Sequence, residues 1–142
     1  MKILSIDYGD SRTGLAHCDK FESIAAPLET IFEKSPDKCF QRILAKAREL
    51  GAELIVVGHP VNMDGTAGAR ARLCEALAER LKAESGIETI LWDERVTTVQ
   101  AIGILNETNV RGKKRKAVLD TVAATLILES YLDYRKKKGI TK

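Results

Sequence analysis

Two strand-like segments at the start of the sequence, residues 2–8 and 13–18, are joined only by the turn Gly9-Asp10-Ser11-Arg12. A connection this short cannot carry the chain back to the other end of a sheet, so the two segments are predicted to pair as an antiparallel hairpin. Residues 27–32 are predicted to form a third strand. The first part of the fold is therefore antiparallel, which excludes a purely parallel sheet.

The strands that follow alternate with helices. The continuous apolar run Leu54-Ile55-Val56-Val57 is typical of a parallel strand that is buried on both faces. A helix before this run is predicted to begin at Ser35-Pro36 and to end at Gly51, because proline favours the first helical position and glycine the position after the last. A second helix ends at Gly86, and residues 87–92 form the next strand.

The C-terminal part is predicted to be helical. Thr97 and Gln100 form a capping-box pattern at the start of one helix, a basic loop covers residues 111–116, and a long helix covers residues 117–134. The complete order, β-β-β-α-β-α-β-α-α, predicts an α/β fold in which helices cover a mixed sheet. A chain of 142 residues corresponds to one domain, which we place at residues 1–138, with a short basic tail at 139–142.

Composition excludes several classes of protein. With 44% hydrophobic and 30% charged residues, the chain is neither fibrous nor of low complexity. No apolar run approaches the ~20 residues of a membrane span, and the N-terminus lacks the pattern of a signal peptide. The three cysteines are widely spaced and odd in number, which indicates no disulfide framework. We therefore expect a cytoplasmic protein with no membrane partner.

Positive charge is concentrated in two short runs. The formal net charge is only +3, yet one run holds Arg111, Lys113, Lys114, Arg115 and Lys116, and another covers residues 135–138. Without these nine residues, 14 basic residues stand against 20 acidic ones. A basic patch on an otherwise acidic body is typical of proteins that bind a polyanion such as nucleic acid. The alternative is ordinary solvated charge on a loop and a frayed tail.

Asp7 is the most informative single residue, because it lies inside the apolar segment Ile3-Leu4-Ser5-Ile6-Asp7. Aspartate is disfavoured in strands, and its burial has to be compensated by a metal ion, an arginine or hydrogen bonds. One interpretation is a metal ligand. The other is a strand-end aspartate that bonds to the Gly9 turn or pairs with Arg12.

Further acids occupy comparable positions. Asp93 and Glu94 follow an apolar strand, where the ligand crevice of α/β sheets lies, and Asp120 flanks the apolar stripe of the last helix. Each also has an ordinary explanation, either a polar corner or an acid favoured by a helix N-terminus. Together, Asp7, Glu94 and Asp120 suggest one site for Mg²⁺ or Mn²⁺, since these ions take carboxylate ligands, and one or two of them can activate water against a phosphodiester.

The loop Gly58-His59-Pro60-Val61-Asn62-Met63-Asp64-Gly65-Thr66 follows a buried strand and borders the same crevice. Asn62, Asp64 and Thr66 could contact phosphate or sugar, or could serve turn formation only, since Asp64-Gly65 is a typical turn pair. His59 is a candidate general base, although a single loop histidine is more often a surface residue. The sequence contains neither a Walker A pattern nor GxGxxG.

Four ordered motifs resemble one known family. They are Ile6-Asp7-Tyr8-Gly9 with Arg12 and Gly14, the loop at 58–66, Asp93-Glu94-Arg95 with Thr97-Thr98, and Lys116 with Asp120, Ala123-Ala124 and Ile127-Leu128. Across essentially the whole chain the sequence is similar to the YqgF (RuvX-like) family of RNase H-fold proteins, which resemble Holliday-junction resolvases and are named as pre-16S rRNA nucleases. His59 is a departure, because we expect an apolar residue before this proline.

The resemblance implies an RNase H-like, five-stranded mixed sheet in the order 3-2-1-4-5, with strand 2 antiparallel. It implies that Asp7, Glu94 and Asp120 form a metal-binding catalytic triad, and that Arg12, Arg95 and Lys116 contact phosphate. We add Asn62, Thr66, Lys113 and Lys114 as further candidates for nucleic-acid binding. Whether Asp93 shares the role of Glu94 is left open by the motif.

Several functions remain open at this point. The favoured one is a metal-dependent nuclease, a hydrolase of phosphodiester bonds, and the resemblance favours trimming of the 5′ end of the 16S rRNA precursor. The alternatives are cleavage of branched DNA and a non-catalytic module that binds nucleic acid. A resolvase would be a symmetric dimer, whereas the rRNA enzyme could be a monomer or a homodimer. A sugar-kinase-like fold needs two related halves, and the chain supplies one.

Overall fold

The computed structural model describes residues 1–61, 64–93 and 112–139, with only the backbone for residues 112–120. The strands are β1 (Ile3–Asp7), β2 (Arg12–Cys18), β3 (Ala25–Phe32), β4 (Leu54–His59) and β5 (Glu88–Asp93). The helices are α1 (Pro36–Leu50), α2 (Ala69–Ser85) and α4 (Gly112–Lys137). The helix expected to start at Thr97 lies outside the described residues.

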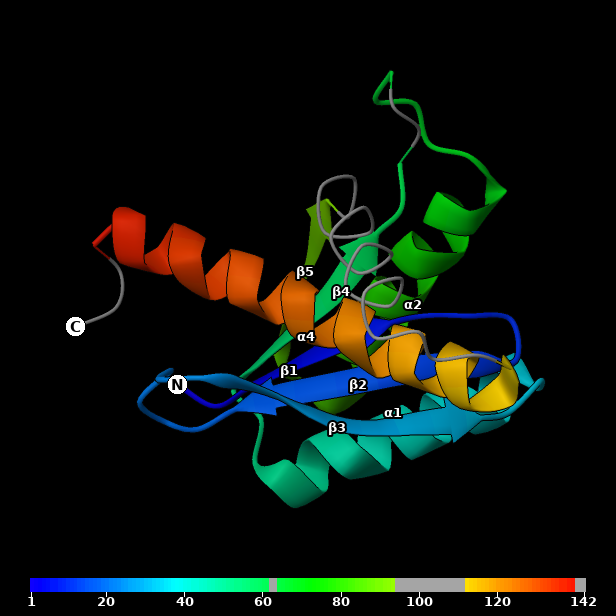
Figure 1. Ribbon diagram of the computed structural model, residues 1–142, viewed down its shortest axis with the longest axis horizontal. Coiled ribbons are helices and arrows are strands. Elements are labelled where there is room, and N and C mark those ends of the chain that lie inside the picture. The colour runs from blue at the N-terminus through cyan, green and yellow to red at the C-terminus, as the bar shows by residue number, and fades with distance from the viewer. Residues whose placement is uncertain (62–63, 94–111, 140–142) are drawn as a thin grey trace.

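The five strands form one mixed sheet in the order β3-β2-β1-β4-β5 (Figure 1). β2 pairs antiparallel with both β1 and β3, whereas β1 and β4, and β4 and β5, are parallel. The predicted hairpin, the strand order and the antiparallel second strand are all confirmed.

The ends of α1 follow the sequence signals. The Ser35 hydroxyl accepts a hydrogen bond from the backbone N–H of Lys38, and Pro36 occupies the first helical position. Gly51 ends the helix with φ of 67°, in the left-handed region that glycine adopts without strain. The limits of this helix were therefore predictable from local residues alone.

Alternation along the strands divides the core into two layers. Leu4, Ile6 and Val57 pack with the apolar faces of α1 and α2. Ile3 and Val56, one position away in their strands, pack against α4 on the other face. Figure 1 shows α4 lying across this second face, so the side chains of β1 and β4 can be assigned to one layer by their position in the strand.

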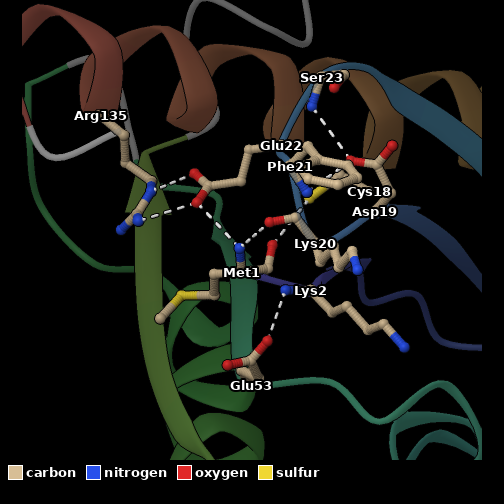
Figure 2. A network of polar contacts seen from close by, with 10 residues as sticks. All are labelled: Met1, Lys2, Cys18, Asp19, Lys20, Phe21, Glu22, Ser23, Glu53 and Arg135. Carbon is tan, nitrogen blue, oxygen red and sulfur yellow. Dashed lines mark hydrogen bonds and ion pairs between the residues drawn. The ribbon is translucent and has the colours of Figure 1, made fainter. Parts of the chain in front are cut away.

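α4 runs antiparallel to β1. Ser5, in the middle of β1, donates a hydrogen bond of 2.7 Å from its hydroxyl to the carbonyl oxygen of Ala124 in α4. Near the other end of the helix, Arg135 donates to Glu22 at 2.6 Å, and the Met1 ammonium group lies 3.3 Å from the same carboxylate (Figure 2). The end of α4 therefore lies beside the start of β1, and its beginning is directed toward Asp7.

One element differs from its prediction. The last helix begins at Gly112 and ends at Lys137, so the basic residues at 113–116 form its first turns and not a loop. Lysine and arginine have high helix propensity, and no proline or glycine interrupts residues 113–137. Treating a charged run as a loop was wrong, because helix formation does not require apolar residues in the first turns.

Among the described residues, no helix is long and apolar enough to cross a membrane.

β3, an edge strand, starts at Ala25 and contains Pro27, whose missing N–H is tolerated at a sheet edge.

Candidate metal centre

Three parallel strands end at the same edge of the sheet. Ile6, one residue before the end of β1, pairs with Val57 of β4. His59 and Asp93, the last residues of β4 and β5, pair with each other. In open α/β sheets the carboxyl ends of parallel strands form the ligand crevice. Asp7, the last residue of β1, is therefore at the edge where a site is expected.

The side chain of Asp7 is on the α4 face of the sheet. Ser5 bonds to the backbone of α4, while Ile6 belongs to the core layer under α1 and α2. Because side chains alternate along a strand, Asp7 shares the face of Ser5. The residue is half-buried there.

The backbone of Asp120 approaches the same place. Asp120 precedes Ala124 by four residues, about 6 Å along a helix, and Asp7 follows Ser5 by two residues, about 6.6 Å along a strand. Since α4 and β1 are antiparallel, going back from Ala124 along the helix and going forward from Ser5 along the strand lead in the same direction. The helix thus carries Asp120 along the strand toward Asp7. The side chain of Asp120 is not among those described, and Glu94 lies outside the described residues.

Asp93 and His59 belong to the opposite face. Trp92 donates a hydrogen bond of 3.1 Å to Ser130 in α4, so its neighbour Asp93 points away from that helix. The Nε2 atom of His59 lies 2.7 Å from a carboxylate oxygen of Glu75 in α2. Asp93 is therefore on the wrong side of the sheet to join Asp7, and His59 is on the wrong side to act as a general base there.

The turn after Asp7 is tight. A Cβ atom added at Gly9 would lie 1.9 Å from the carbonyl oxygen of Arg12, so only glycine fits. Its N–H donates to the Thr13 hydroxyl at 3.4 Å. Arg70 of α2 reaches across to this turn and donates to the carbonyl oxygen of Tyr8 and, at 2.6 Å, to Asp10.

Sequence reasoning missed Arg70. Its partners lie 60 and 62 residues earlier in the chain, and no local pattern connects them. A basic residue in the first turn of a helix is also contrary to the helix dipole, and this mismatch is the one signal that could have drawn attention to it.

The predicted nucleic-acid residues are distributed as follows. Arg12 is the first residue of β2, half-buried beside the Asp7 edge. Thr66 is exposed, and its hydroxyl donates to Asp64 at 2.7 Å, which is the turn-forming interaction left open by the sequence. Lys113, Lys114 and Lys116 are in the first turns of α4, where the backbone is described. Asn62 and Arg95 lie outside the described residues.

Thiol chemistry is not indicated at this edge. Cys39 is buried below the turn, with its sulfur 3.4 Å from the Thr13 hydroxyl. Burial raises the pKa of the Cys39 thiol, so it stays protonated at neutral pH and is a poor nucleophile. Burial likewise raises the pKa of Tyr8.

Carboxylates are the donors that Mg²⁺ and Mn²⁺ require, so the predicted ligand set is chemically suited to such an ion. Within the described part of the chain, no three His, Cys, Asp or Glu side chains form a metal site by themselves. Two of the three predicted ligands, Glu94 and Asp120, are not among the side chains described.

Comparison with known proteins agrees with the motifs. Residues 1–134 match the family described as "RuvX: Holliday junction resolvase". The chain belongs to this RuvX family. A relative from Opitutus terrae, named "Putative pre-16S rRNA nuclease", is 44% identical over 136 residues, covering 95% of this chain and 93% of the relative. A relative of the same name from Syntrophus aciditrophicus is 42% identical, covering 94% and 89%.

Solved structures support the fold. RuvC from Thermus thermophilus, in complex with a Holliday junction substrate, aligns with a TM-score of 0.59 and 14% identity, covering 100% of this chain and 98% of RuvC. The fowlpox virus Holliday junction resolvase aligns with a TM-score of 0.58 and 14% identity, covering 94% and 99%. The RNase H-like fold implied by the sequence resemblance is thus confirmed.

Proposed function

We propose that this RuvX family member is a divalent-metal-dependent nuclease that hydrolyses phosphodiester bonds. The observation that carries the proposal is the position of Asp7. Its side chain is at the carboxyl edge of the sheet, on the face covered by α4, and α4 carries Asp120 toward it. A carboxylate in this half-buried position is suited to binding a cation.

Asp7, Glu94 and Asp120 would hold one or two Mg²⁺ or Mn²⁺ ions. When bound, such ions supply a nucleophilic water and neutralise charge that develops on the phosphate oxygens. The carboxylates fix the ions, while Arg12, Arg95 and Lys116 would orient the sugar–phosphate backbone by contacts that carry no base information. Asn62, Thr66, Lys113 and Lys114 would extend the same backbone contacts.

The proposed substrate is the 16S rRNA precursor, processed at its 5′ end in the cytoplasm. The names of the relatives support it, since they share 42–44% identity with this chain over nearly the full length. Branched DNA is the second candidate, supported by the family description and by the fold shared with RuvC. Resolution of a junction would require a homodimer, because its two scissile strands are related by symmetry. The rRNA reaction could use a monomer.

The test is a cleavage assay with a 5′-labelled rRNA precursor and a four-way DNA junction, each with Mg²⁺ or Mn²⁺. Asp7→Asn, Glu94→Gln and Asp120→Asn should each lower the rate of cleavage more than about 100-fold. This loss is larger than the roughly 10–100-fold loss that is typical when a residue supporting a metal ligand is replaced. Asp93→Asn is the matched control and should cut at the wild-type rate, because Asp93 is on the other face.

Two outcomes would overturn the proposal. One is a purified protein that cuts neither substrate with either ion. The other is equal cleavage by the wild type and all three carboxylate variants. If the protein binds the substrates without cutting, and the variants bind equally well, the chain is a binding module.

A further inference from the structure

The Tyr8-Gly9-Asp10-Ser11 turn is held from outside the hairpin by one residue. The Arg70 guanidinium donates to the backbone carbonyl oxygen of Tyr8 and to the Asp10 carboxylate, 2.6 Å away. Its central carbon also lies 5.7 Å from the centre of the Tyr8 ring. One side chain thus holds both the backbone and the side chain of the residue that directly follows Asp7.

The contact comes from the face opposite Asp7. Tyr8 packs with the core layer under α1 and α2, and Arg70 approaches from α2. Asp7 points to the α4 face instead. Arg70 is therefore placed behind the proposed metal centre, where it can fix the backbone but not touch a substrate bound in front of Asp7.

The two contacts of Arg70 differ in their surroundings. Asp10 is 89% exposed, so an ion pair with it is screened by water and contributes little to stability. The carbonyl oxygen of Tyr8 is fixed in a turn that tolerates no side chain at Gly9. The contact with Tyr8 is the one that restricts the backbone next to Asp7.

We propose that Arg70 is a positioning residue that holds the Tyr8 carbonyl and thereby orients the Asp7 carboxylate toward the metal centre. This inference rests on the proposed function of Asp7. Catalytic carboxylates have to be held within about 0.5 Å of their working geometry, and a displacement of about 1 Å can cost ~100-fold in rate. A rigid guanidinium with several donors can hold both oxygen acceptors at once, which a lysine ammonium group cannot match.

The experiment compares Arg70→Ala and Arg70→Lys with Arg72→Ala, a matched control on an exposed position of the same helix. Arg70→Ala should lower kcat about 10–100-fold with KM changed less than about threefold, and should weaken Mn²⁺ binding in calorimetry without substrate. Arg70→Lys should recover part of the loss, and Arg72→Ala should match the wild type. Asp10→Asn should change kcat less than about threefold, because the Tyr8 contact remains.

A second readout does not depend on catalysis. Amide hydrogen exchange at Gly9 and Asp10 should accelerate in Arg70→Ala and stay unchanged in Arg72→Ala, since the turn would lose its outer contact. If Arg70→Ala has wild-type kcat and Mn²⁺ affinity, the inference is wrong. If it raises KM alone, Arg70 binds substrate and the positioning role is wrong. These results are separate from failure of the proposed centre, which would show as full activity of Asp7→Asn.

Discussion

Glu22 is a charged residue buried at the end of the molecule opposite the proposed centre. It is 8% exposed, and its φ of 54° is unusual for a residue other than glycine. Its carboxylate accepts hydrogen bonds from Arg135 at 2.6 and 3.2 Å and from the Met1 ammonium group at 3.3 Å (Figure 2). This network ties the β2–β3 connection to the end of α4, and it explains why a carboxylate persists in such a position.

Glu22→Gln should therefore destabilise the protein. The neutral amide leaves the nearly buried Arg135 guanidinium without its counter-charge, and breaking a buried pair in this way costs about 3–5 kcal/mol, less where one partner can reach water. We expect a loss of about 2–4 kcal/mol in the free energy of unfolding, measured in urea. Glu49→Gln removes an exposed partner of Lys46 by the same substitution and should cost less than about 1 kcal/mol. If the two substitutions lower the free energy of unfolding equally, burial of the ion pair is not the cause of the loss.

Individual residues differ in how much of their position and contacts could be predicted from the sequence. The place of Asp7 in the first strand was predictable, and the residue stood out because a carboxylate inside an apolar strand conflicts with the local pattern. The partnership of Glu22 with Arg135 was not, since 113 residues separate them. Asp93 and Glu94 could not be told apart from their motif, yet the Trp92–Ser130 contact assigns Asp93 to the face away from Asp7. Roles set by long-range contacts needed the structure.

At the scale of elements, a polar pair joins the end of β4 to α2. His59 and Glu75 lie 2.7 Å apart, and both are partly exposed. The pair lies at the carboxyl edge of the sheet, on the α2 face. His59 thus supports the connection between the strand and the helix, and it replaces an apolar contact expected at this position.

His59→Leu should leave kcat unchanged and lower the free energy of unfolding by at most about 1 kcal/mol, as is usual for a solvated pair. The expected result follows from the face that His59 occupies, because a leucine there cannot disturb Asp7 directly. Cleavage assays and urea denaturation measure the two quantities. A fall in kcat of more than tenfold in a stably folded variant would place His59 in the reaction and contradict the assignment of faces.

Elements with strong end signals were predictable, as the serine, proline and glycine around α1 illustrate. The start of α4 was not, because a run of basic residues fits a solvated loop and a helical first turn equally well. The helix gives the backbone of Lys113, Lys114 and Lys116 a regular arrangement, which suits the phosphate contacts proposed for these residues.

At the scale of the whole molecule, α4 carries basic residues at both ends. Its 26 residues span about 39 Å, so the clusters at 113–116 and 135–138 are far apart. The first is at the end of the helix directed toward Asp7, and the second lies beside Glu22 and the start of β1. The first cluster is therefore the one whose backbone lies nearer the proposed centre.

Salt dependence of binding separates the two clusters. Replacing Lys113, Lys114 and Lys116 with glutamine should weaken binding of the rRNA precursor and reduce the slope of log K against log salt by about 2–3, since each phosphate contact contributes roughly 0.7–0.9. Glutamine has nearly the helix propensity of lysine, so α4 should persist. The matched control replaces Lys136, Lys137 and Lys138, which removes the same charge from the other end. If both triple variants reduce the slope equally, net charge alone drives binding, and the first turns of α4 have no specific role in holding the substrate.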